Sequence, residues 1–592
     1  MTMRQTIKPG YDVLIMGGGP AGSTLAALLA QRSNLTVAVL EREVFPREHI
    51  GESFAHSVTP VLEQSGVLTK VLRSECWVRK YGGFYIWDQE SPAVALFDHA
   101  RWQQDGVLRW TFHVNRSEFD KILLDHARDC GVEVFEGVRV VDFEPNEGSG
   151  VVVRLRDGTR ITGDFFVDAS GRQNSLTTRK KRRWLSRFRN LAVWQHFTGC
   201  LPAQSIDHAW NVFHQENISP IAAFAFRDGW CWDIPVRKMV NGCRTQTHSL
   251  GIVTTPDVIK DPERDFTNPR IFLETLRAVP VLGGLLAEAR PVGDKMHTAT
   301  NYSMINDCFG DFGERWLLVG DSAFFVDPLF SSGVGFALAQ ASAAAMVIMC
   351  TADPAIPSAH KRDLWRDYDR GWHGMAESYA LSIDQWYHAI GRSHPESSYW
   401  QIRGAGVGLD LRERTFHALL SSGMNPGLLQ VLTRGTRSLS DLDSTGPYMR
   451  ALHLADPGDP PESAWLALAP GVYCRESVGL EVPGFKALAH GDSPQYWLDP
   501  VRYHDVVRTP HARPIPCRRF GFCPLPAEEE VRSIDAEDGG TRMWSMLSRG
   551  PARYGDLIRG LPTPGASLLL KKLIRAGIVT ANVVPASRRV TP

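Results

Sequence analysis

A dinucleotide-binding pattern near the N-terminus constrains the fold of this chain more than any other feature. Residues 11–41 read as an apolar strand, a helix of small residues and a second strand, with Gly17, Gly19 and Gly22 at the spacing G-x-G-x-x-G. In such a unit Gly17 makes the tight turn, Gly19 admits a pyrophosphate and Gly22 allows close helix–strand packing. Glu41 ends the second strand, where a carboxylate accepts hydrogen bonds from ribose hydroxyls. The pattern therefore predicts a dinucleotide at the N-terminus of the helix.

Two segments further along the chain favour FAD over NAD as this dinucleotide. Arg116 opens a predicted helix in "VNRSEFDKILL" and would face the anionic cofactor. In "WLLVGDSAFFVDP", Asp321 ends an apolar strand, and the small residues after it are expected to begin a helix. A carboxylate at that position suits a hydrogen bond from a ribityl hydroxyl. An NAD enzyme would not need a second nucleotide-contacting segment about 300 residues beyond the first.

Composition excludes several classes of protein. The 592 residues include 65 basic and 65 acidic side chains, a balance that predicts neither a nucleic-acid nor a membrane partner. The 10 cysteines form no CxxC pair and no metal-ligand spacing, so we expect reduced thiols in a cytoplasmic protein and no metal site. The N-terminus does not read as a secretory signal, and the apolar stretch 336–350 reads as a buried helix too short to span a bilayer.

Strand patterns fill much of the N-terminal half and predict an α/β protein. Apolar residues alternate through 132–145 and 151–168, with a hairpin turn at Asp157-Gly158. Further strand-rich stretches lie at 80–115 and 190–300, and we expect such a sheet to roof the cofactor and to form a substrate chamber.

A pair of tryptophans stands in the stretch "GWCWDIP", residues 229–235. Trp230, Trp232 and Ile234 alternate along a strand and therefore share one face, while Pro235 is expected to end the strand. Two readings remain open at this point. The tryptophans either pack in a core or form a wall between two compartments.

Lys80 is a second unusual residue, because the stretch "WVRKYGGFYIW" (77–87) surrounds it with aromatic side chains. A lysine is commonly a solvated surface charge. In apolar surroundings, however, an ammonium group has a lowered pKa and becomes reactive. Arg79 is the neighbouring alternative, but a guanidinium cannot lose its proton and suits that role poorly.

A glycine-rich turn in "FVDPLFSSGVGFA" (325–337) opens the apolar helix. Main-chain N–H groups and the positive end of the helix dipole would make this turn an anion site, at Ser332 and Gly333. The alternative is an ordinary flavin-binding turn, with Pro328 beside it, that holds the pyrimidine edge of the ring.

Together these stretches resemble the flavin-dependent halogenases over roughly residues 10–400. The matching motifs are W-x-W-x-I-P from Trp230, K-x-G at Lys80, F-x-x-P-x-x-S-x-G from Phe325, R-x-x-F-D at Arg116, Gly320-Asp321, and the strand and turn "FFVDASGRQNSL" (165–176). "FPREHIGESF" (45–54) resembles the strap between flavin and substrate, which would place Glu52 and Ser53 near the isoalloxazine; a capping role is the alternative for Glu52. The resemblance implies an FAD-binding three-layer ββα Rossmann-type domain with a mixed β-sheet substrate domain, within residues 1–350.

The resemblance also implies a mechanism. A separate flavin reductase supplies reduced FAD, which reacts with O₂ to give a C4a-hydroperoxide, and chloride or bromide held at Ser332 and Gly333 converts it to hypohalous acid. Trp230 and Trp232 keep the organic substrate from the flavin, while Lys80 delivers electrophilic halogen to an aromatic ring. The rivals are an FAD-dependent monooxygenase or reductase of the same fold, which would not need the tryptophan motif, and a non-catalytic flavoprotein.

One departure from the family pattern concerns the substrate. The tryptophan-halogenating branch has a Glu two residues before the halide-binding residue, where this chain has Phe330. Without that carboxylate the ring should be activated already, which points to a phenol or pyrrole in secondary-metabolite biosynthesis. Members of that branch often act on substrates tethered to a carrier protein. Asp327 is a candidate substitute base, although Asp-Pro at a turn also has a structural reading.

The C-terminal part differs in composition from the rest. Residues 351–453 read as amphipathic helices that pack on the core, and the Pro/Gly-rich residues 454–471 read as a linker. Residues 472–592 would form a C-terminal domain. Its helical patterns at 543–561 and 566–577, followed by an apolar strand, suggest a winged helix. Such a module would dock a carrier protein or pack on the core; DNA binding fits a neutral chain poorly.

Overall fold

The computed structural model describes residues 6–55, 58–80, 82–86, 93–96, 111–145, 150–172, 182–185, 188–201, 221–300, 302–354, 358–391, 394, 396–404, 460–469, 472–481, 488–490, 493–495, 513–522, 534–535, 537–561, 566–575 and 579–581. Contacts within the chain divide it into two compact units. The first comprises Met1–Ala345, His373–Gly423 and Trp497–Pro510, and the second comprises Met346–Trp372, Met424–Tyr496 and His511–Pro592.

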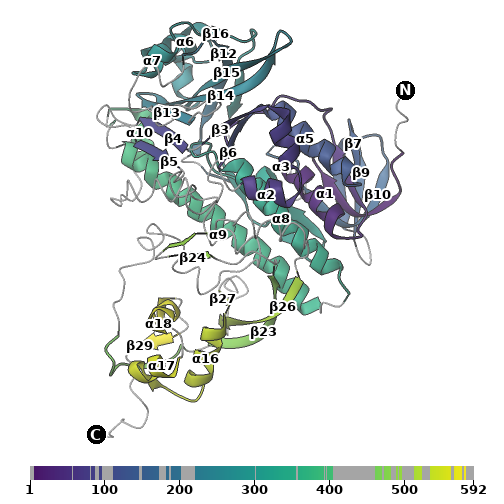
Figure 1. Cartoon of the computed structure of the whole chain (residues 1–592), viewed down its shortest axis with the longest axis vertical. Helices are drawn as coiled ribbons and strands as arrows, with labels where there is room; N and C mark the ends of the chain where they lie inside the picture. Colours follow the sequence, from purple (N-terminus) through teal and green to yellow (C-terminus); the bar gives the residue numbers. More distant parts are fainter. Residues whose placement is uncertain are drawn as a thin grey trace. The chain divides into compact units, whose positions relative to one another are not determined.

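The first unit contains a mainly parallel sheet that includes the predicted βαβ motif (Figure 1). Its strands are β1 (Gly10–Met16), β2 (Val37–Glu41), β7 (Glu133–Glu136), β8 (Val140–Pro145), β9 (Val151–Leu155), β10 (Arg160–Asp168), β19 (Gly310–Asp311) and β20 (Trp316–Leu318). In the order β19-β20-β10-β1-β2-β7, the strands from β20 to β7 run parallel. Helices α1 (Pro20–Arg32) and α5 (Arg116–Asp129) pack against each other, and α1 packs on β1 and β2. The βαβ prediction is confirmed.

The hairpin predicted at Asp157-Gly158 joins β9 to β10, and Gly158 has a positive φ of 91°. These strands extend the sheet of the βαβ unit. β10 pairs with β9 in its first half and runs parallel to β1 as far as Asp168. Burial alternates in the first half of β10 and is continuous over Phe165–Asp168, as expected for a strand that becomes covered on both faces.

A second sheet of the first unit lies within the ranges predicted for the substrate chamber. Its strands are β4 (Gly82–Ile86), β5 (Ala93–Leu96), β12 (Leu191–Thr198), β13 (Ile221–Phe226), β14 (Gly229–Val240), β15 (Cys243–Thr254), β16 (Arg290–Pro291) and β17 (His297–Thr300). The order is β16-β12-β15-β14-β13-β4-β5, with β17 also paired to β12. Only the β13–β4 pair is parallel in this described sheet, which is therefore mixed, as predicted.

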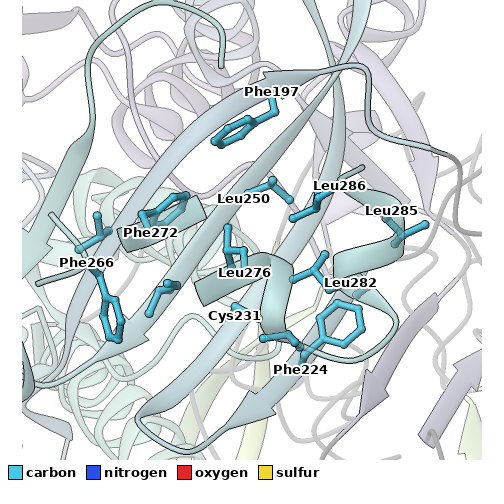
Figure 2. Packing of buried hydrophobic residues seen from close by; sticks show 14 of the residues in the cluster. Phe197, Phe224, Cys231, Leu250, Phe266, Phe272, Leu276, Leu282, Leu285 and Leu286 are labelled. Carbon is cyan, nitrogen blue, oxygen red and sulfur yellow. The ribbon is translucent and has the colours of Figure 1, made fainter. Parts of the chain in front are cut away.

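One face of this mixed sheet carries a large hydrophobic core (Figure 2). Helices α6 (Pro269–Ala278) and α7 (Leu282–Leu285) cover that face. Buried side chains that meet there include Phe197, Phe224, Cys231, Leu250, Phe272, Leu276, Leu282 and Leu286. Because neighbouring residues of a strand face opposite sides, Cys231 in this core places Trp230 and Trp232 on the other face of β14.

Pro235 does not end β14, which continues to Val240. Our expectation was wrong because a proline interrupts a strand only where its missing N–H group would have donated to a neighbouring strand. The two-residue turn Asn241-Gly242, with φ values of 51° and 81°, joins β14 to β15. In an antiparallel pair, residues opposite each other alternate between hydrogen-bonded and non-hydrogen-bonded pairs. Counting from the pair Val240–Cys243 next to the turn, Pro235 and His248 form a non-hydrogen-bonded pair, so β15 needs no N–H group from residue 235. The Pro235 nitrogen faces the other edge, where pairing with β13 stops at Asp233.

The segment after β20 also differs from our expectation. Asp321 lies in the short 3-10 turn η6 (Gly320–Ser322), and β21 (Phe324–Phe325) follows it instead of a helix. The reason is that both phenylalanines pair with β18 (Met304–Asn306), which in turn pairs with β11 (Arg182–Trp184). Helix α8 (Gly333–Ala352) begins only after this strand and the turn that follows it.

Helix α8 contains the predicted buried stretch 336–350 and is longer than expected. Among the described helices it alone has the length and composition to cross a membrane, and 83% of its most apolar window is buried within the protein. Helices α9 (Ser358–Gly391) and α10 (Ser398–Gly404) follow in the predicted helical region, of which 405–453 lie outside the described residues. Shorter elements of the first unit are α2 (Val58–Gln64), α3 (Leu68–Ser74), β3 (Trp77–Lys80) and β6 (Thr111–Val114).

In the second unit, β22 (Trp465–Leu468) is the middle strand of a three-stranded sheet, between β28 (Ala552–Arg553) and β29 (Val579–Ala581). This strand falls within 454–471, so the prediction of a simple linker there was wrong. Proline and glycine flank the strand, but its side chains take part in a core. The buried residues of that core include Leu466, Met543, Leu547, Leu557, Leu570, Leu573 and Val579.

Three helices contribute to this core, α16 (Glu537–Leu547), α17 (Tyr554–Gly560) and α18 (Ala566–Arg575). The stretch 543–561, predicted as one helical pattern, is divided between α16, β28 and α17. Gly550-Pro551 explains the break, since proline cannot continue a helix. The remaining strands are β23 (Val472–Glu481), β24 (Leu488–His490), β25 (Ser493–Gln495), β26 (Arg513–Phe522) and β27 (Ile534–Asp535).

Candidate active site

A cavity of about 670 Å³ lies in the first unit at the ends of β1, β2 and β10. The carboxyl ends of parallel strands are where such sheets usually bind ligands. The predicted site residues that line the cavity are Gly17, Gly19, Glu41, Glu52, Ser53, Arg116, Trp230, Trp232, Asp321, Pro328 and Gly333. Gly22, Lys80 and Ser332 do not line it, but each lies next to a residue that does. The structure therefore brings together segments that are far apart in the sequence.

The glycines after β1 leave room at the N-terminus of α1, which begins at Pro20. Gly17 has a φ of 109°, a conformation that other residues rarely adopt. A Cβ atom on Gly22 would lie 2.0 Å from the carbonyl oxygen of Gly17, so helix and strand approach too closely for any side chain. A Cβ atom on Gly19 would meet only Arg47, at 3.5 Å. This open approach to a helix N-terminus fits a pyrophosphate.

Charged side chains around this opening are held in place by the main chain. The carboxylate of Glu41 accepts hydrogen bonds from the N–H groups of Gly18 and Glu43, at 2.6 and 2.8 Å. Arg116 forms a buried bidentate pair with Asp120 (2.8 and 3.0 Å) and donates to the carbonyl of Ile50. Glu41 and Arg116 are thus fixed at the cavity wall, where ribose and phosphate groups would lie.

Asp321 also lines the cavity, and its carboxylate lies beside Arg172. Arg172 Nε is 3.6 Å from the Asp321 carboxylate, and its guanidinium lies over the rings of Tyr302 and Phe325. Burial raises the pKa of Asp321, while Arg172 and Arg116 oppose that shift. The open N-terminus of α1, Glu41 and Asp321 meet in one cavity, which fits FAD.

The strap residue Glu52 pairs with a histidine from the mixed sheet. Its Oε1 lies 2.7 Å from Nε2 of His196, and both side chains are buried. Burial alone would raise the pKa of Glu52, but the adjacent His196 overrides burial and keeps that pKa below its usual value. Glu52 caps no described helix, since α2 begins only at Val58, so the pair ties the strap to β12. His196 carried no sequence signal, because its partner lies 144 positions earlier.

Lys80 is fully buried at the end of β3, which excludes the solvated-charge alternative. Its Nζ donates hydrogen bonds to Ser53 Oγ at 2.8 Å and to the carbonyl of Phe54 at 2.9 Å. Burial lowers the pKa of Lys80 to about 7. Ser331 Oγ donates to the same Ser53 Oγ at 3.1 Å, and both serines line the cavity. A serine pair therefore separates Lys80 from the cavity.

Trp230 and Trp232 are both buried and both line the cavity. Their ring centroids are 6.0 Å apart, with the planes tilted by 52°. The Trp232 ring lies over Gly251 of the neighbouring strand, where a Cβ atom would come within 2.1 Å of it. The indole N–H groups donate to Tyr387 and Ser249, at 2.9 and 3.3 Å. The two side chains therefore form a fixed aromatic wall on the β14 side of the cavity.

The turn before α8 presents main-chain groups to the cavity. Gly333 is the first residue of the helix, so the N–H groups of this first turn have no partner within it. The Ser332 side chain points away and donates to the hydroxyl of Tyr379 on α9. Ser332, Gly333 and Tyr379 line a separate cavity of about 10 Å³, which has room for about one water-sized group. The geometry permits an anion at the main chain of this turn.

Asp327 and Phe330 belong to the same turn and face away from the large cavity. Phe330 packs against Tyr85, with ring centroids 5.6 Å apart. Asp327 accepts hydrogen bonds from Asn190 and from the N–H of Leu329, both at 3.0 Å. This arrangement does not support the expectation that Asp327 is a substitute base at the substrate.

Comparison with known proteins identifies the family. A family profile described as tryptophan halogenase matches residues 12–97 and 79–248. The chain is 32% identical over 396 residues to the tryptophan 2-halogenase of Chondromyces crocatus, covering 66% of this chain and 69% of that protein. It is also 32% identical over 403 residues to the 1H-pyrrole-2-carbonyl-[peptidyl-carrier protein] chlorinase of Pseudomonas fluorescens, covering 64% of this chain and 82% of that one.

Solved structures agree with this assignment. CmlS, a flavin-dependent halogenase, has the same fold at a TM-score of 0.68 and 22% identity, covering 98% of this chain and 96% of its own. The myxobacterial chondrochloren halogenase CndH, an FAD-dependent enzyme, is 27% identical at a TM-score of 0.56, and the match covers 70% of this chain and 90% of CndH. The chain therefore belongs to the flavin-dependent halogenases, oxidoreductases that use FAD, O₂ and chloride or bromide to halogenate aromatic substrates.

Proposed function

We propose that this protein chlorinates or brominates an electron-rich phenol or pyrrole in secondary-metabolite biosynthesis, with Lys80 as the catalytic residue. The observation that carries the proposal is the position of Lys80. Its amine is fully buried and hydrogen-bonded to Ser53, which lines the cavity. Trp230 and Trp232 close another wall of the same cavity. A reactive amine lies next to a cavity that the two tryptophans close on one side. This arrangement suits an enzyme in which a small oxidant passes from the cofactor to the amine, and in which cofactor and substrate do not touch.

A separate flavin reductase would supply reduced FAD. Together with O₂, the reduced FAD would provide the oxidising power that converts halide to hypohalous acid. The main-chain N–H groups of Ser332 and Gly333, at the positive end of α8, would hold the halide at the cavity wall. Gly17, Gly19, Glu41, Arg116, Asp321 and Pro328 would hold the cofactor, and Glu52 with Ser53 would lie beside its ring.

Lys80 would hold the hypohalous acid by a hydrogen bond or react with it to form a haloamine. In the second case the neutral amine displaces hydroxide from the halogen, an N–halogen bond forms, and water is released. The aromatic ring then attacks the halogen and loses a proton. Burial favours the neutral amine that this step requires.

Phe330 supports a phenol or pyrrole substrate, because an apolar ring stands where the tryptophan-halogenating branch has a carboxylate. Among the relatives, the P. fluorescens enzyme is named for a pyrrole bound to a peptidyl carrier protein. We propose a carrier-tethered substrate by analogy. The C. crocatus relative is named for tryptophan, so free tryptophan belongs in the substrate test.

We further propose that the enzyme works in a reducing cytoplasm, since every cysteine whose side chain the structure describes is a free thiol. The order α16–β28–α17–α18–β29 supports a winged-helix-like C-terminal module.

The test is halogenation by the purified chain. It is supplied with FAD, a flavin reductase, NADH, O₂ and bromide or chloride, and offered a phenol, a pyrrole bound to a carrier protein, or tryptophan. We expect a product heavier by one halogen, by mass spectrometry, only when halide is present. Hydroxylated product without halide would instead indicate a monooxygenase. Lys80→Ala should abolish halogenation, whereas the exposed Lys121→Ala, on α5, should not change it. Native-rate halogenation by Lys80→Ala would overturn the role of Lys80.

A further inference from the structure

A buried chain of hydrogen bonds lies behind Trp230, on the side away from the cavity. The indole N–H of Trp230 donates to the hydroxyl of Tyr387 at 2.9 Å. That hydroxyl is 3.2 Å from both carboxylate oxygens of Asp327. Trp230 comes from β14, Tyr387 from α9 and Asp327 from the turn before α8. One carboxylate is thus linked to the aromatic wall by way of a distant helix.

The Asp327 carboxylate is itself fixed from the other side. It accepts a hydrogen bond from Asn190 Nδ2 at 3.0 Å, and the amide oxygen of Asn190 accepts one from Arg403. The Arg403 guanidinium lies over the rings of Tyr399 and Tyr387, with its central carbon 3.8 and 5.5 Å from their centroids. The chain therefore continues from the wall to a buried cation on α10.

While Asp327 is ionised, this network permits one arrangement of its hydrogen bonds. An indole N–H and a guanidinium can only donate, and an ionised carboxylate can only accept. The Tyr387 hydroxyl must therefore accept from Trp230 and donate to Asp327, while Asn190 must donate to Asp327 and accept from Arg403. Trp230, Asp327, Asn190, Tyr387 and Arg403 are all at most 2% exposed. Water has little access here, and the Tyr399 hydroxyl, which lies near Trp230 and Tyr387, is the other polar group within reach if a link is broken.

We propose that Asp327 and Tyr387 are positioning residues that fix the indole of Trp230 in the cavity wall. Asp327 directly precedes Pro328, which lines the cavity in the turn that leads to Gly333. The carboxylate therefore couples the orientation of the wall to the turn proposed to hold the halide. The proposal rests on the proposed function, in which Trp230 separates the cofactor from the substrate. It assigns to Asp327 a role different from that of a base.

The alternative is that Tyr387 only fills space beneath Trp230. In that case the Tyr387→Phe variant, which keeps the ring and removes the hydroxyl, would behave as the native protein. Tyr11→Phe is a matched control. Tyr11 is also a buried tyrosine whose hydroxyl donates to a carboxylate, Glu133 Oε2 at 2.8 Å, but it lies at the start of β1 and does not line the cavity.

The first measurement needs no catalysis. In the full chain with oxidised FAD bound, the indole N–H signals are recorded by NMR after ¹⁵N-tryptophan labelling, and Trp230→Phe assigns the signal of Trp230. We expect Tyr387→Phe to shift this signal upfield and to speed its hydrogen exchange about tenfold, as for loss of one buried hydrogen bond. Asp327→Asn should move it in the same direction, and Tyr11→Phe should leave it in place. An unmoved signal in Tyr387→Phe would overturn the proposal.

The second measurement is coupling, the halogenated product formed per O₂ consumed, with hydrogen peroxide measured as the leak. We expect Tyr387→Phe to lower coupling about threefold to tenfold. In the Trp230→Phe background, which lacks the indole N–H, the same change should cause no further loss. Equal losses in both backgrounds would show that Tyr387 acts elsewhere and would refute the proposal. If the native chain makes no halogenated product, the proposed function fails, and the indole signal still decides whether Tyr387 positions Trp230.

Discussion

Lys80 is the side chain whose chemistry is changed most by its surroundings. Burial lowers its pKa to about 7, and only the neutral amine can attack an electrophilic halogen. A depressed lysine pKa means that the reactive form increases as the pH rises through that value. We therefore expect the single-turnover rate of halogenation to rise between about pH 6 and pH 8 and to level off above. The measurement is product formed by rapid quench at saturating halide.

Asp327 provides the control for this pH profile, because burial raises its pKa to about 7 as well. If Lys80 is the titrating group, Asp327→Asn keeps the rise near pH 7 even where coupling falls. Lys80→Arg, which cannot deprotonate, should lose at least about a hundredfold in rate at every pH. A profile that loses its rise in Asp327→Asn would assign the titration to the carboxyl group instead.

Gly251 is a second position where one residue determines the site. A Cβ atom there would lie 2.1 Å from the ring of Trp232, and the ring cannot move away without disturbing the cavity wall. We expect Gly251→Ala to lower the free energy of unfolding by about 1–3 kcal/mol and to reduce coupling. Gly313→Ala is the control, since its Cβ would approach only the side chain of Asp311, at 3.3 Å. If thermal unfolding shows that Gly251→Ala and Gly313→Ala lose the same amount of stability, this account of Trp232 is wrong.

At the scale of elements, the βαβ unit uses its glycines for two separable purposes. Gly22 permits contact between α1 and β1, because a Cβ atom there would meet the Gly17 carbonyl at 2.0 Å. We expect Gly22→Ala to destabilise even the flavin-free protein by about 1–3 kcal/mol. Gly19 caps α1 with a φ of −69°, which alanine also adopts, so Gly19→Ala should lower that stability by no more than about 1 kcal/mol.

The affinity for FAD should also differ between Gly19→Ala and Gly22→Ala. A methyl group on Gly19 occupies the approach of the pyrophosphate, so we expect Gly19→Ala to weaken FAD at least about tenfold. The measurements are thermal unfolding without FAD and a fluorescence titration with FAD. A Gly19→Ala variant that binds FAD as the native chain does would show that the phosphates lie elsewhere.

Elements with a local signature were predictable from the sequence. The glycine spacing, the alternation around Trp230 and the apolar run before Glu41 each depend on residues a few positions apart, and the structure contains the corresponding turn, strand face and buried strand. Elements that depend on distant pairing were not predictable. β21 forms because β18 lies beside it, and Pro235 is tolerated because β13 has already stopped. Neither partner is visible in a short window of sequence.

At the scale of the whole molecule, the same limit applies to the candidate site. The sequence pattern identified 11 of the residues that line the cavity, because they belong to motifs, but it did not select Arg172, which also lines it. It missed His196, Tyr387 and Asn190, which reach the site only through tertiary packing. The aromatic residues of α9 read as ordinary core residues at helical spacing, and burial alone cannot distinguish packing from a hydrogen-bonded role. The structure separates the two for Tyr387, because it shows the hydrogen bonds of the Tyr387 hydroxyl to Trp230 and Asp327.

The second unit provides the last prediction. β22 supplies the middle strand of its three-stranded sheet from residues that read as a linker, and Leu466 of that strand is fully buried among residues of α16, α17 and α18. We expect Leu466→Ala to destabilise this unit by about 2–5 kcal/mol. Hydrogen exchange should therefore increase across α16–α18 but not in the strands around the cavity. Leu468→Ala, at a half-buried position of the same strand, should have a smaller effect. Unchanged exchange in α16–α18 of Leu466→Ala would mean that residues 460–469 are a linker after all.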